Sequence, residues 1–376
     1  MHRPQHLKHA VLIAAFASAG TAGCAVSAGD FDVRGGAGHA RASCALPADD
    51  ARWIAAAAPT EQGELAAWCA AVGPAVLRVP SAQTADTAID SLVVVTWNTH
   101  VGGGDIVAFV DDLRAGQWTG GRPVTHFVLL LQEVHRSGPA VPAGLPAGAR
   151  GAARITHDGA RERPDVVEIA NRLGLALWYV PSMRNGLAGD EPGEDRGNAV
   201  LATLPLSDVA AIELPLEAQR RVATTATVRA MDGAGRAWAL QVTSLHLDNR
   251  SRLARGLATF GSARTRQARA LVAALAAERE AVVGGDLNTW SFDALEDAPH
   301  VLRRAFPDAP PQTEPTFVAA GVVPRRLDHL YFRTDTGGMS GPVRVDARYG
   351  SDHHPVLAWV TPHAADVQAP NDDGPG

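Results

Sequence analysis

The stretch Ala-Val-Val-Gly-Gly-Asp-Leu-Asn-Thr, residues 281–289, is a short β-branched run that ends in a carboxylate and a carboxamide two positions apart. A run of this kind bounded by glycines predicts a buried strand. Residues i and i+2 of an extended chain lie on the same side, so Asp286 and Asn288 can face one ligand. Glycines before the acid allow another backbone or a substrate to approach closely. Taken alone, the segment is also compatible with a strand that ends in an Asx-turn.

Other apolar runs of the same type recur along the chain and predict further buried strands. Helical periodicity is found between some of them, at 106–113, 166–173 and 265–277. Many strands with few helices, some joined by short connections, indicate packed sheets covered by helices. The stretch 136–163 is dense in Pro, Gly and Ala and predicts a long surface loop. The predicted strands lie at 92–97, 127–131, 175–180, 199–202, 223–228, 238–242, 281–283, 327–332 and 356–360.

Several of these strands end in polar side chains that carry chemistry. A single residue of this kind is commonly a hydrogen-bonding group at a sheet edge. Six such ends together, with carboxylates, carboxamides and imidazoles, indicate one site, because folds of this class place their sites at strand ends. The residues are Asn98, Gln132-Glu133, His246, Asp286 with Asn288, Asp328-His329, and Asp352-His353.

Length and charge narrow the classes of function. A chain of 376 residues can bury a large core in one or two domains. Its formal net charge of −6 argues against a protein that holds nucleic acid through a global positive field, although a local basic groove remains possible.

The N-terminus predicts export. A basic segment with Arg3 and Lys8 precedes the apolar run 10–17, which is too short for a comfortable transmembrane helix. Thr21-Ala22-Gly23-Cys24 follows and is similar to a lipobox, so we expect a signal peptide over 1–23 and a lipid anchor at Cys24. An ordinary signal peptide cut nearby is the alternative, because Thr21 stands where a lipobox usually has Leu.

The segment between the signal and the main domain is predicted to have two parts. Residues 24–42 predict a flexible tether, and residues 43–82 a small helical extension. Cys44 and Cys69 are the even pair left after Cys24, which predicts a disulfide in an exported protein. The main domain is expected over 88–362, followed by a disordered tail over 363–376.

The ordered set of strand-end motifs resembles the endonuclease/exonuclease/phosphatase superfamily, the deoxyribonuclease I-like fold. The resemblance spans residues 92–360 and implies an α/β (α+β) fold, a four-layered sandwich of two packed, mostly antiparallel β-sheets flanked by helices. It also implies a phosphoesterase site at one edge that depends on a divalent metal. The matching segments are 97–98, 132–133, 197–201, 244–247, 285–288, 327–329 and 351–353.

The resemblance also implies roles for single residues. Glu133, Asn98 and Asp352 would be the metal ligands, and their hard oxygens suit Mg²⁺ or Mn²⁺. His246 and Asn288 would donate hydrogen bonds to phosphate oxygens.

His353, paired with Asp328, would act as general base or as a phosphate-stabilising cation, and Asp286 is the competing general base. Asn198 and Arg250 are substrate-binding candidates. His100 and His246 depart from the residues of relatives that cut DNA at abasic sites, which disfavours that activity.

We therefore expect an exported, divalent-metal-dependent phosphodiesterase or nuclease that uses metal-assisted, in-line attack of water. Its substrate would be nucleic acid, a phospholipid headgroup or a small phosphodiester. A phosphomonoesterase or a sphingomyelinase-type hydrolase with the same site is one alternative, and a surface-anchored binding protein with an inactive site is another. We expect a monomer without a protein partner, located in the periplasm or on the outer surface.

Overall fold

The computed structural model describes residues 51–55, 59–80, 83, 87–157, 163–190, 192–249, 262–290, 297–319 and 321–362. All of them belong to one unit of the chain, Val33–Gly376. The predicted signal peptide, the tether, Cys44 and the C-terminal tail lie outside the described residues, so these predictions are not tested. In the described part of the chain, no helix has the length and apolar character that crossing a membrane requires.

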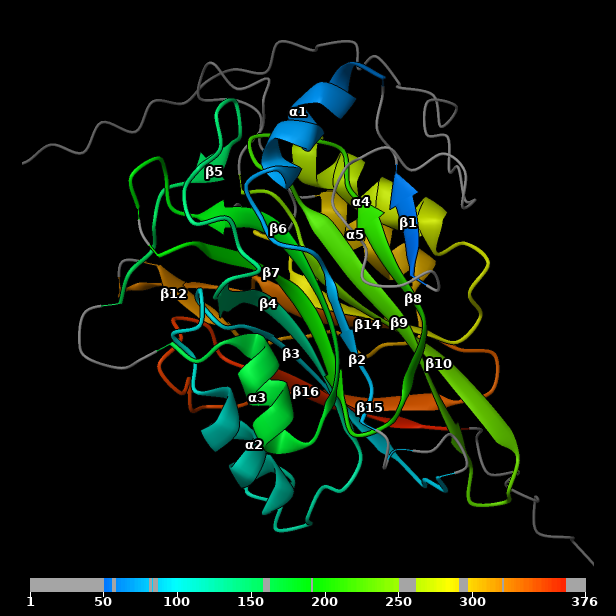
Figure 1. The fold of residues 1–376 in the computed structure, drawn as a ribbon. Coiled ribbons are helices and arrows are strands. Elements are labelled where there is room, and N and C mark those ends of the chain that lie inside the picture. Colours follow the sequence, from blue (N-terminus) through cyan, green and yellow to red (C-terminus); the bar gives the residue numbers. More distant parts are fainter. Residues whose placement is uncertain are drawn as a thin grey trace, which may run out of the picture. The chain divides into compact units, whose positions relative to one another are not determined.

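Two β-sheets form the centre of the fold (Figure 1). The first has six strands in the order β1-β8-β9-β10-β11-β14. The second has eight, in the order β15-β16-β3-β4-β7-β6-β2, with β5 paired to β6. The strands of the first sheet are β1 (Arg52–Ala55), β8 (Leu206–Glu213), β9 (Val222–Met231), β10 (Ala237–His246), β11 (Ala281–Asp286) and β14 (Asp328–Arg333).

In the second sheet, the residues of strand β3 (Leu92–Asn98) are all buried. A separate two-stranded ribbon is formed by β12 (Phe317–Ala319) and β13 (Val323–Arg325). The remaining strands of the second sheet are β2 (Val76–Arg78), β4 (Phe127–Ser137), β5 (Gly151–Ala152), β6 (Ala176–Asn185), β7 (Glu194–Ala202), β15 (Gly338–Arg344) and β16 (Val356–Thr361).

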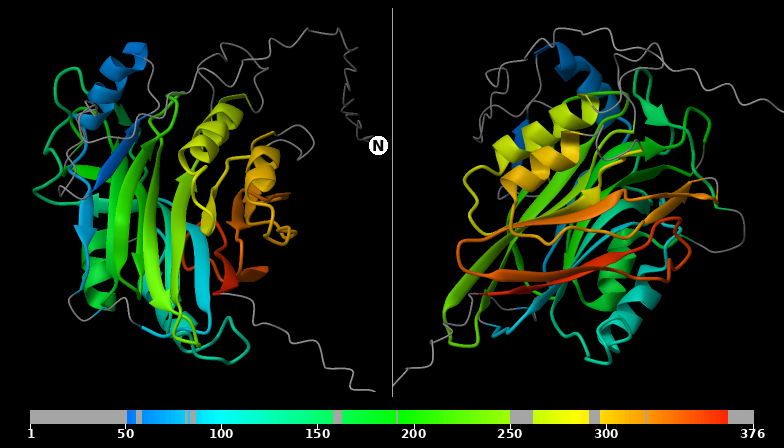
Figure 2. Two further views of the ribbon diagram at one scale, coloured as in Figure 1. Left: turned by 90° about the vertical axis from the view of Figure 1, so that its right-hand side faces the viewer. Right: turned by 180° about the vertical axis from the view of Figure 1, so that it is seen from behind.

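Helices cover the outer faces of both sheets, which gives four layers (Figure 2). The inner faces share one core, in which Val94 and Val128 of the second sheet join Ala226 and Val242 of the first. Helices α2 (Ile106–Arg114) and α3 (Val166–Leu173) pack on the second sheet. Helices α4 (Ser262–Ala274) and α5 (Asp297–Ala305) pack on the first. The predicted four-layered sandwich is confirmed.

Most neighbouring strands are antiparallel, but two central pairs are parallel, and these position the site. β3 pairs with β4 in parallel, and β10 pairs with β11 in the same way. Parallel neighbours bring their carboxyl ends to the same edge of a sheet. The polar residues that end β3, β10 and β11, together with Glu133 within β4, therefore gather at one end of the sandwich.

The structure also differs from the predicted elements. Within 43–82, only helix α1 (Pro59–Cys69) is helical among the described residues, and β1 and β2 are edge strands of the two sheets. The predicted helical extension is therefore partly built into the sandwich. Helix α4 begins and ends three residues earlier than 265–277, and the sequence patterns missed β8, β15 and α5.

Gly285 is required where β11 passes β10. A Cβ atom at this position would lie 1.9 Å from the backbone oxygen of Leu245. Gly284 meets side chains instead, at 2.8 Å from Leu130 and Leu330. The predicted role of the glycines, close approach of another backbone, is confirmed at Gly285.

We expect Gly285→Ala to destabilise the domain by about 1–3 kcal/mol or more, because the backbone contact with Leu245 cannot relax without moving a central strand. Gly63→Ala is the matched control, since a Cβ there has no neighbour within 4 Å and Gly63 lies in α1. Urea unfolding would measure both. Equal stability of the two variants would contradict the close-approach argument.

Candidate active site

Asp286 ends β11 at the centre of the site. Its register pairs it with His246 of β10 on one side and Asp328 of β14 on the other. The carboxylate is only 2% exposed and is held by two donors. Oδ1 accepts the backbone N–H of Asn288 at 2.8 Å, and Oδ2 accepts Nδ2 of Asn98 at 3.0 Å. Burial raises the pKa of Asp286 to about 7, against the opposing attraction of His353.

His353 and Asp328 form a buried hydrogen-bonded pair. Nδ1 of His353 lies 2.7 Å from Oδ2 of Asp328, and Nε2 lies 3.9 Å from Oδ2 of Asp286. Burial opposes the charged ring, but the attraction and hydrogen bond of Asp328 outweigh it and raise the pKa of His353 to about 10. His353 is therefore an imidazolium at neutral pH. The predicted pairing of these two residues is present in the structure.

Glu133 reaches the site through an irregularity in β4. The pairing of β4 with β7 shifts register between Leu131 and Val134, and Glu133 has a φ of +51°. Bulges of this kind redirect a side chain and are frequent beside active sites. The Thr99 hydroxyl donates to the backbone oxygen of Glu133 at 3.1 Å, which holds the bulge beside the end of β3. Oε1 of Glu133 lies 4.0 Å from Nδ1 of His246.

His246 lies between Asp286 and a buried arginine. Nη1 of Arg221 is 3.0 Å from Nδ1 of His246, and Nδ2 of Asn288 is 2.9 Å from Nε2. A neutral imidazole has one acceptor, so the two donors compete for it, and the charged guanidinium is the stronger donor. The ring proton then resides on Nε2, 3.5 Å from Oδ2 of Asp286.

The charge of His246 follows from the same neighbours. Burial, followed by the repulsion of Arg221, His353 and Arg196, lowers the pKa of His246 well below its usual value. The ring is therefore neutral, in contrast to His353. Arg221 and Arg196 are buried residues that the sequence patterns missed. The adjacent arginines before strand β9, Arg220 and Arg221, were the available signal.

Asn98 and Asn198 are held by hydrogen bonds within the protein. Oδ1 of Asn98 accepts the backbone N–H of His100 at 2.9 Å and Nδ2 orients Asp286; Oδ1 keeps a second lone pair, so its predicted role as a metal ligand stays a prediction. Nδ2 of Asn198 donates to the backbone oxygens of Val222 and Ser244, at 2.9 and 3.4 Å. Asn198 therefore ties the two sheets together through Nδ2, and its predicted role in binding substrate stays a prediction. Gln132 has a similar tying role, because it donates to Ser244 Oγ at 3.0 Å.

Asp352 lies at the rim of the site. Its Oδ1 is 3.9 Å from Nε2 of His353 and 3.5 Å from Nδ1 of His100. His329 and His354 make backbone contacts outside this group, to Arg326 O and Val345 O. Arg250 lies outside the described residues, so its predicted role stays a prediction.

The carboxylates at this edge fit a divalent cation. Oδ1 of Asp328 and Oδ1 of Asp352 are both buried and have no hydrogen-bond partner among the described residues. Buried oxygens of this kind call for a bound ion or water. Asp286, Asp328 and His353 place polar atoms within 4.8 Å of one another, but the protonated ring of His353 has no lone pair for a metal, so the carboxylate oxygens are the candidate ligands. This set differs from the predicted ligands, because the sequence could not show which carboxylates converge.

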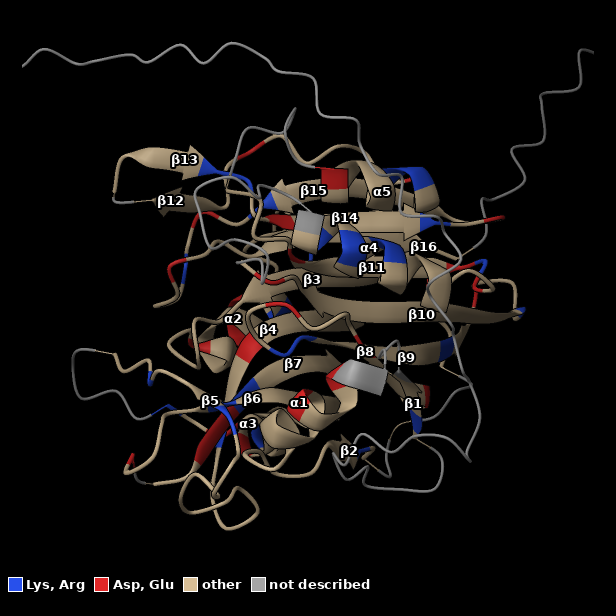
Figure 3. Cartoon of the chain, turned by 90° about the horizontal axis from the view of Figure 1, so that it is seen from above, with Lys and Arg blue, Asp and Glu red and all other residues tan. Residues whose placement is uncertain are grey.

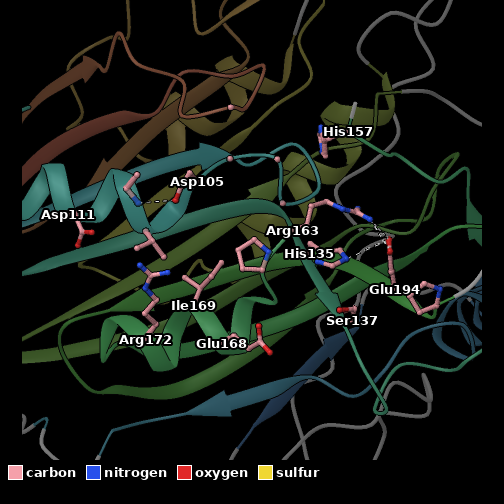
Figure 4. Close-up of a pocket in the computed structure, with 18 residues that line it drawn as sticks. Asp105, Asp111, His135, Ser137, His157, Arg163, Glu168, Ile169, Arg172 and Glu194 are labelled. Atoms are coloured by element: carbon pink, nitrogen blue, oxygen red, sulfur yellow. Dashed lines mark hydrogen bonds and ion pairs between the residues drawn. The ribbon is translucent and has the colours of Figure 1, made fainter. Parts of the chain in front are cut away.

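A large cleft lies beside this group, bordered by α2, α3 and the loop after β3 (Figure 4). Its volume is about 1470 Å³. Gly102, Gly103 and Gly104 form one wall, and His135, His157 and Glu194 line another part. The cleft does not include Asp286 or His353, so the reacting groups lie next to it and not within it.

Residues 95–353 match the model of the Endonuclease/Exonuclease/phosphatase family. The chain belongs to this family. The match covers more than half of the sequence and includes every strand end described above. The protein is accordingly a hydrolase of phosphoester bonds. No curated protein gives a significant match.

Solved structures with low sequence identity are also similar to this member of the family. An endonuclease/exonuclease/phosphatase from Beutenbergia cavernae is 21% identical, with 74% of this chain and 73% of that chain covered and a TM-score of 0.49. The 3'-5' exonuclease NExo from Neisseria meningitidis is 14% identical, with 71% and 98% covered and a TM-score of 0.38. Beta toxin from Staphylococcus aureus, with bound magnesium ions, is 12% identical, with 72% and 99% covered and a TM-score of 0.35.

The contact between Arg221 and His246 gives a test of the site. We expect Arg221→Met to lower kcat about 10-fold or more, because the tautomer of His246 is no longer fixed and one charge-assisted hydrogen bond is lost. The assay is hydrolysis of bis-(p-nitrophenyl) phosphate. Arg229→Met is the control, since Arg229 lies near the other end of β9 and pairs with Asp208 at the surface. An equal loss in both variants would contradict the assignment.

Proposed function

We propose that this hydrolase is a divalent-metal-dependent phosphodiesterase or nuclease that activates water for in-line attack on phosphorus. The observation that carries the proposal is that two neighbouring acid–base groups, Asp286 and His353, have clearly separated pKa values. Asp286 has a pKa near 7, whereas His353 is held as an imidazolium by Asp328. Groups whose environments separate their pKa values in this way are the expected acid–base pair of an active site.

In this proposal Asp286 is the general base. Its carboxylate is ionised in a substantial fraction of molecules near pH 7 and accepts a proton from water at Oδ2. Asn98 and the backbone of Asn288 fix the orientation of the carboxylate. His353 already carries its proton, so it cannot act as a base at this pH. Its Nε2–H is instead suited to stabilise the negative charge of the phosphoryl group.

His246 and Asn288 provide the second part of the phosphate site. Nε2 of His246 and Nδ2 of Asn288 are both donors and lie 2.9 Å apart. A non-bridging phosphate oxygen placed beside them would accept from both and would remove the competition between the two donors. A neutral His246 gives this binding without a further positive charge next to His353.

A divalent cation, Mg²⁺ or Mn²⁺, would be held by carboxylates of the same edge. Glu133 and Asp352 supply hard oxygens. Oδ1 of Asp328, opposite Asp286 in the sheet, is buried and has no hydrogen-bond partner among the described residues. When bound, the ion would polarise a phosphoryl oxygen and stabilise the leaving oxygen. Asn98 would also contribute, by holding Asp286.

We further propose that the protein is exported and anchored through a lipid at Cys24, with a disulfide between Cys44 and Cys69. The sequence features of residues 1–24 and the even cysteine pair support this proposal.

A phosphomonoesterase or a phospholipid hydrolase with the same residues is the second candidate. The net charge of −6 favours small or lipid substrates over long polyanions.

Hydrolysis of bis-(p-nitrophenyl) phosphate should be abolished by EDTA and restored by Mg²⁺ or Mn²⁺, because the acidic edge needs a cation to bind phosphate.

His353→Gln should lower kcat about 100-fold or more, since a phosphate-stabilising charge is lost. His354→Gln is the neighbouring control and should retain activity, because His354 contacts the backbone of Val345. Full activity of His353→Gln would refute the proposed mechanism.

The pH dependence follows from the two pKa values. Activity should fall about tenfold per pH unit below an apparent pKa near 7, as Asp286 becomes protonated. It should also decline as the pH passes about 10 and His353 loses its proton. The two titration steps belong to the interacting pair Asp286 and His353. Asp328→Asn removes the carboxylate that raises the pKa of His353, so the alkaline limb of the profile should move to lower pH. A profile that is flat from pH 5 to 8 would rule out Asp286 as the base.

A further inference from the structure

The cleft beside the active site is lined by a buried histidine whose ring is only partly paired. His135 is 4% exposed, and its Nδ1 has no hydrogen-bond partner among the described residues. Nε2 lies 3.6 Å from Oε2 of Glu194 and so already has an acidic partner. A buried imidazole normally satisfies both nitrogens, so an unsatisfied nitrogen of a ring that lines a cleft points to a ligand.

Other polar groups line the same cleft around His135 (Figure 4). Nε2 of His157 lies 2.6 Å from the carbonyl oxygen of His100, and a carbonyl only accepts, so Nδ1 of His157 is the acceptor of that ring. Ser137 adds a hydroxyl. The cleft therefore offers both donors and acceptors at fixed positions, which is the pattern that complements hydroxyl groups.

The glycines of the adjoining loop fix the two rings. A Cβ at Gly102 would lie 2.6 Å from Cβ of His135, and a Cβ at Gly103 would lie 2.6 Å from the ring of His157. The backbone of the loop thus packs directly between the two histidines. This packing restricts the movement of both histidine side chains, so the cleft is already formed before a ligand binds.

The charges of the cleft do not suit a polyanion. Four carboxylates line it, of Asp105, Asp111, Glu168 and Glu194, against the two guanidinium groups of Arg163 and Arg172. Arg163 is already bound to both carboxylate oxygens of Glu194, at 2.9 and 3.0 Å. Basic and acidic residues are also interspersed over this side of the chain (Figure 3). A nucleic-acid backbone would need an excess of basic residues here.

The cleft is connected to the reacting groups by short contacts. His135 follows Glu133 by two residues in β4. His100, in the loop that forms the wall, lies 3.5 Å from Asp352, which in turn lies 3.9 Å from His353. Gly350 lines the cleft two residues before Asp352. A substrate with its phosphate at His353 would therefore extend one of its alcohol groups toward the cleft.

We propose that the cleft binds the alcohol part of the substrate, a neutral group that carries several hydroxyls, and that His135 is a specificity-determining residue for it. The proposal rests on the proposed phosphodiesterase function and names its substrate class: small phosphodiesters of polyols or sugars. His135 contacts a hydroxyl through Nδ1, while Nε2 faces Glu194, and the reaction itself takes place at Asp286 and His353.

The test compares two diesters that differ in the alcohol, glycerophosphoglycerol and bis-(p-nitrophenyl) phosphate. His135→Leu removes both ring nitrogens. We expect its kcat/KM, relative to the wild type, to fall about tenfold further for glycerophosphoglycerol than for bis-(p-nitrophenyl) phosphate, the loss expected for one or two hydrogen bonds. His126→Leu is the matched control, because His126 also has a buried unpartnered Nδ1 but lies at the opposite end of β4.

A binding measurement separates this inference from the proposed function. In EDTA, glycerophosphoglycerol should shift the ¹⁵N imidazole signals of His135 and leave those of His126 unchanged. If neither diester is hydrolysed, the proposed function fails, while the shift still tests the cleft. Equal losses for the two diesters in His135→Leu, no shift of His135, or a selective loss on plasmid DNA would each overturn the inference.

Discussion

The contact between strands β10 and β11 at Gly285 is the constraint on which the site depends. The absence of a side chain lets the backbone of β11 lie against Leu245, and this sets the register that pairs Asp286 with His246. β14 pairs with β11 on the other side and brings Asp328 to the same level. A slip of one residue would turn every one of these side chains to the opposite face of the sheet. The geometry of the acid–base groups is thus a consequence of backbone packing.

The interface between the two sheets adds a second constraint, because polar side chains cross it. Gln132 of β4 donates to Ser244 of β10, and Asn98 of β3 donates to Asp286 of β11. Each bond joins the second sheet to the first within a few residues of the reacting groups. The sheets therefore cannot slide against each other without breaking buried hydrogen bonds, which are costly to leave unmade. This rigidity is what a phosphate site with several donors requires.

The sequence located the central strands because each depends on a local apolar pattern. The predicted ends before Asn98 and Asp286 lie within three residues of those in the structure, whereas β4 and β10 continue past their predicted ends to Ser137 and His246. Strand β8 was missed because its sequence, with Ser207 and Asp208, interrupts the apolar pattern at a register shift.

Partners across the fold could not be predicted in the same way. Whether Asn98 faces a metal or Asp286, and whether Asn198 faces substrate or Val222, depends on which strands lie opposite. The same holds for the bulge at Glu133, which has no local sequence signature, and for Arg221, because a pair of adjacent arginines does not indicate that one of them contacts His246. The burial of His135 likewise follows from packing against the loop after β3.

The two histidines of the site show why partners matter more than residue types. His246 and His353 are both buried, and burial alone would make both neutral. Asp328 keeps a proton on His353, whereas Arg221 keeps one off Nδ1 of His246. One imidazole is therefore a cation and the other a neutral donor, within reach of the same carboxylate. A chain that kept both histidines but lost Arg221 or Asp328 would have the same motifs and a different distribution of protons, so its chemistry at phosphorus would differ as well.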